Sequence, residues 1–183
     1  MLYLALWIYF IIICIVYYFF LSGFVSIIFW KWVPYVPTYN ADLNILKNQL
    51  KLSPWKKFID LWCWDWKVLR LMERQFKLSL IVWYDINSYA VTFWKIINKL
   101  WGYKKIQLFN KNFLKADLSQ FDYVYTYLLT NLMEEIEEKL FSQIGSDTIV
   151  ISNTFKFKKH LPFETLKNSE WNKKTWHNSG CHR

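Results

Sequence analysis

The chain has 183 residues, of which 54% are hydrophobic and 20% are charged. This length suits one domain of ordinary size, and the composition excludes an intrinsically disordered protein. The net charge of +9 indicates an anionic partner, either membrane lipid or nucleic acid. The three cysteines, Cys14, Cys63 and Cys181, do not form the pattern of a disulfide framework.

The first thirty residues contain no charged side chain. They form a longer apolar run than the ~18 residues that indicate a membrane span. A cleaved signal peptide is the alternative, but it needs a charged start and a shorter apolar segment. All 23 lysines and arginines follow residue 30. The positive-inside rule therefore predicts a single-pass transmembrane anchor at 1–30, with the rest of the chain in the cytoplasm.

Two prolines, Pro34 and Pro37, mark a linker over residues 31–40. Beyond it, helical spacing of apolar residues alternates with short apolar runs that are typical of buried strands. This alternation predicts an α/β domain at 41–165, with a parallel sheet covered on both faces, and then a polar tail at 166–183. In chain order we expect a helix at 41–51, a strand at 58–62, a helix at 66–77, a strand at 79–85, a helix at 88–101, strands at 105–109 and 121–129, a helix at 131–144 and a strand at 146–152.

Neither of two groups of possible metal ligands predicts a metal site. The acidic run of Glu134, Glu135, Glu137 and Glu138 fits a solvated helix face, on which Glu135 can pair with Lys139. In the tail, the spacing does not fit a closed four-ligand site. The tail residues concerned are His177, Cys181 and His182.

Two acidic residues stand at the first two predicted strands. Asp60 lies in the first strand and Asp85 ends the second. This layout is typical of nucleotide-binding α/β domains, in which the loop after the first strand faces the ligand and the second acid holds the ribose hydroxyls. Such a loop needs glycines for positive φ and close backbone approach. Here the alternating positions hold Trp62, Trp64 and Trp66.

With glycine at those three positions the loop would be D-L-G-C-G-D-G-K, which resembles the first motif of class I S-adenosylmethionine (SAM)-dependent methyltransferases. The second predicted strand, ending V-W-Y-D at residues 82–85, resembles the V-G-x-D of that family. The segment K-W-V-P-Y-V-P-T, at 31–38, is similar to a segment of a membrane-anchored subgroup related to histone-lysine methyltransferases. Residues 122–129 and 150–155 resemble the fourth and fifth strand segments of that subgroup.

The resemblance implies a Rossmann-like methyltransferase sheet, SAM as the cofactor, and a lysine of a membrane-associated protein as the methyl acceptor. It implies that Asp60 orients the amino acid part of the cofactor, Asp85 the ribose, and Asn112 with Phe113 the adenine. Asn112 stands where the family usually has an acid. The C-terminus is short for the closing hairpin of this fold, so a reduced hairpin is expected. The remaining expected cofactor-binding residues are Trp62, Cys63, Trp64, Asp65, Trp66 and Ile86, and the expected substrate-channel residues are Thr38, Tyr127, Asn153 and Phe155.

The chain has an excess of tryptophan and a shortage of glycine. It has 12 tryptophans and 4 glycines, where the usual ~7% would give about 13 glycines. One explanation is a genetic code in which UGA means glycine and is translated here as tryptophan. Two alternatives take the tryptophans as genuine: a degenerate, membrane-anchored binding protein without activity, or a protein that uses them as an aromatic binding surface. For an active enzyme, RNA is the alternative substrate to a protein lysine. The tryptophans that coincide with family glycines are Trp32, Trp55, Trp62, Trp64, Trp66 and Trp83.

Overall fold

The computed structural model describes the backbone of residues 2–29, 38–63, 66–86, 88–166 and 179–182. Within these ranges, the side chains of residues 2, 19–29, 89 and 179–182 are not described. The chain divides into two compact units, Met1–Tyr35 and Val36–Arg183.

The first unit contains helix α1 (Leu2–Phe29), which is 28 residues long. The segment is free of proline, so no residue inside it lacks the backbone N–H that a helix needs. Its described side chains, at residues 3–18, are all exposed. The side chains of residues 19–29 of this helix are outside the described set, and among the described residues no helix is both long and apolar enough to cross a membrane. The anchor expected at 1–30 stays a prediction, and most of the linker at 31–40 lies outside the described residues.

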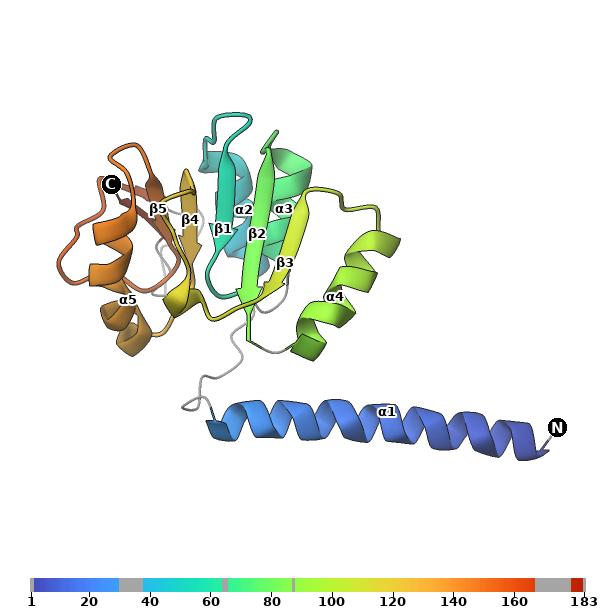
Figure 1. The fold of residues 1–183 in the computed structure, drawn as a ribbon. Helices are drawn as coiled ribbons and strands as arrows, with labels where there is room; N and C mark the ends of the chain where they lie inside the picture. The colour runs from blue at the N-terminus through green and yellow to red at the C-terminus, as the bar shows by residue number, and fades with distance from the viewer. Residues whose placement is uncertain (1, 30–37, 64–65, 87, 167–178, 183) are drawn as a thin grey trace. The chain divides into compact units, whose positions relative to one another are not determined.

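The second unit is built on a seven-stranded sheet with the order β3-β2-β1-β4-β5-β7-β6 (Figure 1). Strands β1 to β5 run parallel to their neighbours among themselves, and β7 is antiparallel to both β5 and β6. From β1 to β3 successive strands are added on one side of β1, and β4 and β5 are added on its other side. The boundary between β1 and β4 is therefore the topological switch point, where open α/β sheets bind ligands. The strands are β1 (Lys57–Asp60), β2 (Leu80–Asp85), β3 (Ile106–Asn110), β4 (Tyr123–Thr126), β5 (Ile149–Ser152), β6 (Glu164–Leu166) and β7 (Ser179–His182).

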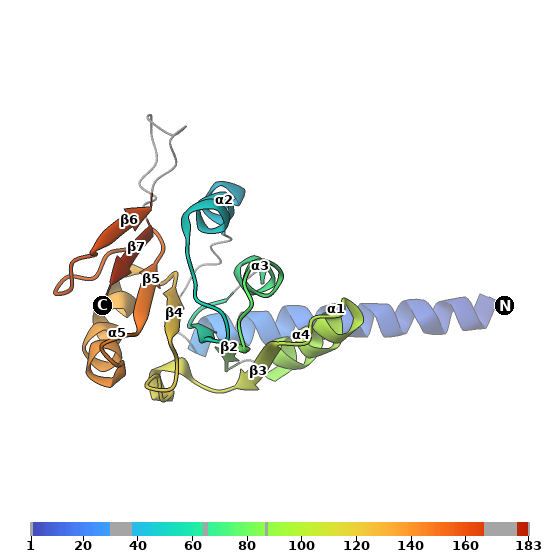
Figure 2. The same cartoon turned by 90° about the horizontal axis from the view of Figure 1, so that it is seen from above.

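Helices cover both faces of the sheet, as predicted. Alternate residues of each strand point to opposite faces, so Phe58 and Ile59 belong to two different cores. The core with Phe58 is shared with α2, α3 and α4, and the core with Ile59 is shared with α5. Figure 2 shows α2 and α3 on one side of the sheet and α5 on the other. The helices are α2 (Asn40–Gln49), α3 (Lys67–Gln75), α4 (Ser88–Leu100) and α5 (Thr130–Gln143), with a 3₁₀ turn η1 (Phe113–Lys115).

All of the helices and strands predicted within 41–165 are present, but several strands are shorter than expected. The strand predicted at 121–129 is β4, which covers Tyr123–Thr126. Phe121 and Leu128 are buried although they lie outside the strand. An apolar run therefore predicts which residues are buried, and the buried segment is longer than the strand that pairs in the sheet.

The C-terminal segment differs from the expected polar tail. Strands β6 and β7 form an antiparallel hairpin, and β7 also pairs with β5, with Ile151 opposite Cys181. The boundary at residue 166 therefore falls within the sheet, and the closing hairpin is present with strands of three and four residues. Strand pairing uses backbone N–H and C=O groups, which polar residues supply as well as apolar ones. The polar composition of this segment therefore gave no indication of β7.

The acidic run on α5 is a solvated face only in part. Glu134, Glu135 and Glu138 are exposed, but Glu137 is 2% exposed. The pairing expected between Glu135 and Lys139 is also wrong, because the Lys139 Nζ instead donates to the backbone oxygens of residues 114 and 116.

Glu137 holds the segment that follows β5. Its carboxylate accepts hydrogen bonds from the backbone N–H groups of Lys158, Lys159 and His160 at 3.1, 2.7 and 3.1 Å. The Nδ1 of His160 lies 2.9 Å from the same carboxylate, and the His160 ring stacks on Phe141. One buried carboxylate therefore organises three successive residues of the loop.

We expect Glu137→Gln to lower the free energy of unfolding at pH 7 by about 1–3 kcal/mol. Burial by itself raises the pKa of Glu137, but the hydrogen bonds from His160 and from the backbone of residues 158–160 bring it below its ordinary value. Because the folded-state pKa is lowered, the stabilisation is present above the unfolded pKa of about 4.3 and is lost as the pH falls through the folded value.

Urea unfolding of both chains at pH 7 and at pH 3 tests this expectation. The difference between the parent chain and Glu137→Gln should shrink at the lower pH. Glu135→Gln, an exposed change on the same helix, is the control and should stay within about 0.5 kcal/mol of the parent. An equal difference at both pH values would contradict the role of the ionised Glu137.

Candidate functional site

The two predicted carboxylates lie at the same edge of the sheet. Asp60 is opposite Trp83 in the β1–β2 ladder, and Asp85 is two residues farther along β2. Because residues two apart in a strand share a face, Asp60 and Asp85 project on the same face, roughly 7 Å apart along the strand direction. Both stand at the carboxyl ends of strands beside the switch point between β1 and β4, so the structure brings them together as predicted.

The loop after β1 begins with a turn made by Asp60. This side chain is 1% exposed, and its Oδ1 accepts a hydrogen bond from the backbone N–H of Trp62 at 3.0 Å. Cys63 is buried, whereas Trp64 and Asp65 lie outside the described residues. Trp66 then precedes the first residue of α3.

Two tryptophans have the backbone conformation that favours glycine. The φ angles are +64° at Trp55 and +62° at Trp66, and Thr154 is the remaining non-glycine residue with positive φ in the described part of the chain. A side chain with a Cβ in this left-handed region costs about 1–2 kcal/mol, and glycine avoids that cost. Trp62 and Trp83 do not have positive φ.

The indole N–H of Trp66 is also in an unfavourable environment. Its side chain is fully buried, and its ring centroid lies 4.5 Å from that of Trp83 and 4.8 Å from that of Trp94. Within the described part of the chain its indole Nε1 has no hydrogen-bond partner, and a buried donor in that state costs about 1–3 kcal/mol. The position thus combines good apolar packing with an unfavourable backbone and an unpaired donor.

The residues predicted to hold adenine lie beside the loop. The ring of Trp62 meets the ring of Phe113 edge-on, with centroids 5.8 Å apart. Asn112 Oδ1 accepts a hydrogen bond from Leu114 N at 2.9 Å, so this oxygen caps η1. The Ile86 backbone oxygen accepts from Asn110 Nδ2 at 2.7 Å, which fixes the end of β2.

A buried polar cluster lies on the same face as Asp60. Tyr125 is opposite Asp60 in the β1–β4 ladder. Asn153 follows β5, and its Nδ2 lies 3.4 Å from Oδ2 of Asp42 on α2. Asp42, Tyr125 and Asn153 are each 1% exposed. Asp42 was not predicted as a site residue, because an acid in the first turn of a helix usually interacts favourably with the helix dipole. Tyr125 was not predicted because it lies within an apolar strand, where a tyrosine is expected to belong to the core.

The Tyr125 hydroxyl lies in the field of two buried carboxylates. Burial raises the pKa of Tyr125 well above its ordinary range, and the carboxylate of Asp60, followed by that of Asp42, raises it further. The nearby Asn153 side chain lowers it, but no described residue makes a hydrogen bond of ordinary geometry with the Tyr125 hydroxyl. A buried hydroxyl beside two carboxylates can receive a ligand that is cationic or rich in hydrogen-bond donors.

Three of the four predicted substrate-channel residues lie close together. The rings of Tyr127 and Phe155 pack with centroids 6.3 Å apart, and Phe155 N donates to the backbone oxygen of Asn153 at 2.7 Å. Thr38 is buried, and its backbone oxygen accepts from Lys67 Nζ at 3.1 Å. This contact ties the segment before α2 to the start of α3.

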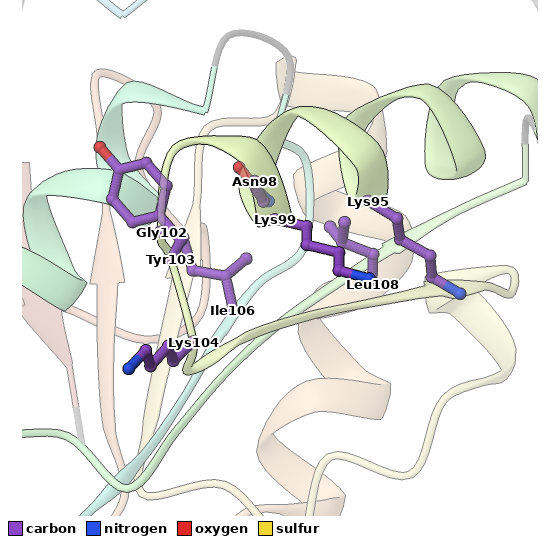
Figure 3. Close-up of a pocket in the computed structure, with 8 residues that line it drawn as sticks. All are labelled: Lys95, Asn98, Lys99, Gly102, Tyr103, Lys104, Ile106 and Leu108. Atoms are coloured by element: carbon purple, nitrogen blue, oxygen red, sulfur yellow. The ribbon is translucent and has the colours of Figure 1, made fainter.

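A hollow of about 350 Å³ lies between α4 and β3 (Figure 3). None of the predicted site residues that the structure describes lines it. Among the residues that the structure describes, no group of three or more His, Cys, Asp or Glu side chains is placed to hold a metal ion. His177 lies outside the described residues, and the side chains of Cys181 and His182 are not described.

No family model matches the chain. A protein-lysine N-methyltransferase of Saccharolobus islandicus (strain REY15A) is 27% identical over 141 residues, which are 76% of this chain and 88% of that protein.

Solved structures show the same fold. An RNA methyltransferase from Salinibacter ruber, in complex with S-adenosyl-L-homocysteine, superposes with a TM-score of 0.67 at 21% identity over 80% of this chain and 92% of that one. Ribosomal protein L11 methylase from Lactobacillus delbrueckii subsp. bulgaricus gives a TM-score of 0.58 at 14% identity over 83% and 91%. A mutant of MtNAS in complex with SAM gives 0.64 at 11% identity over 79% and 62%. The chain therefore has the same Rossmann-like fold as these structures.

Proposed function

We propose that the chain is a SAM-dependent methyltransferase whose cofactor site is the sheet edge formed by Asp60, the loop at 61–66 and Asp85. The observation that carries this proposal is the position of two carboxylates on one face, beside the switch point of a sheet with methyltransferase strand order. SAM supplies a methyl group on a positively charged sulfur. The buried carboxylate of Asp60 suits the ammonium group of such a ligand, and the half-buried Asp85 suits a ribose diol.

The proposed acceptor is a lysine of a protein. The similarity to a protein-lysine N-methyltransferase supports this choice. The cluster of Asp42, Tyr125 and Asn153 supports it as well, because a buried carboxylate beside hydrogen-bonding groups attracts an amine. Catalysis would consist mainly of alignment of the neutral amine with the methyl group. RNA is the second candidate acceptor, and the similarity to an RNA methyltransferase structure and the net charge of +9 favour it.

We also propose that the chain acts at a membrane, with α1 as its anchor and the second unit in the cytoplasm. The support is the uncharged 28-residue sequence of α1 and the confinement of all lysines and arginines to the chain after residue 30. A membrane-associated protein would then be the acceptor, because tethering raises the local concentration of substrates in the same membrane.

The tryptophans at family glycine positions are proposed to be glycines in the protein as it is made, through a code in which UGA means glycine. The positive φ angles of Trp55 and Trp66 support this proposal, as does the unpaired Nε1 of Trp66. Without the Trp62 indole, the space beside Phe113 would be open to another flat bicyclic ring, the adenine. The alternative, with true tryptophans, is a membrane-anchored binding protein of methyltransferase fold without activity.

Binding of SAM by an Asp85 variant tests the function. In a chain with glycine at 62, 64 and 66, we expect Asp85→Ala to weaken SAM binding about 10- to 100-fold in calorimetric titrations. The reason is that hydrogen bonds to a charged acceptor contribute about 1.5–3 kcal/mol. Asp117→Ala is the control, because that exposed carboxylate is hydrogen-bonded to Ser119 on the surface, and it should leave the affinity unchanged. Equal affinity of the Asp85 variant and its parent would rule out this site.

A further inference from the structure

One face of α4 exposes a row of large apolar side chains. Phe93, Ile96 and Leu100 are three and four residues apart, so they form one stripe along the helix. Their side chains are 42%, 56% and 73% exposed. Single exposed apolar residues are common on soluble proteins, whereas a continuous row marks an interaction surface.

Lysines border this stripe. Lys95 and Lys99 of α4 line the hollow beside β3, together with Lys104 of the following turn. Figure 3 shows Lys95 and Lys99 extending from α4 toward β3, whose Ile106 and Leu108 form the apolar side of the hollow.

The hollow is positively charged because Lys95, Lys99 and Lys104 line it and no acidic side chain of the described residues does. The carboxylate of the nearby Glu73 is engaged with the backbone N–H groups of Lys104 and Lys105, at 2.7 and 3.3 Å.

We propose that this face of α4 docks on the surface of an anionic lipid bilayer. Phe93, Ile96 and Leu100 enter the boundary between headgroups and acyl chains, and a phospholipid headgroup occupies the lysine-lined hollow. Apolar side chains bordered by lysines are the pattern of helices that lie in the membrane interface, and lysines near anionic lipids strengthen such binding. A nucleic acid is less suited to this face, because its phosphates and bases find no partner in Ile96 or Leu100.

Hydrogen exchange of the full chain in lipid nanodiscs tests the docking. The α4 amides should exchange more than about tenfold more slowly in discs of phosphatidylcholine with phosphatidylglycerol than in discs of phosphatidylcholine alone. The α5 amides should not change. Because α1 is present in every sample, recovery of the chain with the discs reports the proposed anchor, and α4 exchange reports the docking separately.

Two charge-matched variants show whether the lysines of this face are responsible. Lys95→Glu with Lys99→Glu should abolish the difference between the two lipids. Lys51→Glu with Lys77→Glu, two exposed positions elsewhere, should retain it, and Ile96→Ser should reduce it.

Three outcomes would overturn the proposal. One is equal exchange of α4 in both lipids. Another is protection of α4 that depends on chain concentration rather than on lipid charge, since that indicates a second copy. The third is protection by an RNA oligonucleotide in the absence of any lipid effect.

Discussion

Replacement of Trp62, Trp64 and Trp66 by glycine is expected to give a chain that binds SAM at least about a hundredfold more tightly than the chain with tryptophans. The Trp62 ring fills the space beside Phe113, and a Cβ in the loop prevents close approach of the backbone to a ligand. A hundredfold change corresponds to about 2.7 kcal/mol, which is modest for the removal of indoles from a binding site. Equilibrium dialysis with labelled SAM measures the change.

The glycine variant is also expected to fold. Loss of a buried tryptophan at position 66 costs about 3–5 kcal/mol by analogy with substitutions to alanine. Relief of the positive φ returns about 1–2 kcal/mol, and removal of the unpaired Nε1 about 1–3 kcal/mol. These terms nearly cancel at position 66, so the change at this buried position is not expected to unfold the chain. Trp101→Gly, at an exposed position outside the loop, is the control and should not create SAM binding.

The mass of the tryptic peptide Phe58–Lys67 from the native source decides which residues the loop really carries. Three glycines are the expected result, and they would establish an intact cofactor loop. Three tryptophans, together with a glycine variant that still fails to bind SAM, would contradict the proposed enzyme. The chain would then be a binding protein that uses a methyltransferase fold.

Asp60→Asn is expected to reduce SAM binding by more than about a hundredfold in the glycine-containing chain. The substitution retains an oxygen that can accept the hydrogen bond from Trp62 N, so the turn after β1 should survive. It removes the negative charge opposite the cofactor's ammonium group. Removal of one partner from a buried charge pair typically costs about 3–5 kcal/mol. Thermal unfolding of the variant should confirm that the fold is retained.

Asp42→Asn is the matched comparison for Asp60→Asn, because both carboxylates are 1% exposed. Asp42 belongs to the proposed acceptor side of the site, since it meets Asn153 and lies on α2 rather than on the loop. We expect SAM binding to persist in this variant while methyl transfer to lysine falls. Loss of SAM binding in both variants would show that the two carboxylates serve the same ligand.

The proposed cofactor site at the sheet edge could be predicted from the sequence, because the patterns that indicate it extend over only a few residues. Asp60 and Asp85 follow short apolar runs that form strands, and parallel strands bring their carboxyl ends to one edge. The excess of tryptophan is visible by counting. What Trp62, Trp66 and Phe113 contact was not predictable, because ring contacts depend on the packing of η1, α3 and α4 against the sheet.

The alternation of helices and strands and the pair of acids at the sheet edge could be predicted from the amino-acid sequence. Those features follow from side-chain periodicity and backbone sterics, which act over a few residues. Three features depend on packing between distant segments: the burial of Glu137, the contact of Asp42 with Asn153 across 111 positions of the chain, and the pairing of the polar end of the chain with β5. A polar residue is buried only when partners from distant segments satisfy it, and no local pattern specifies those partners.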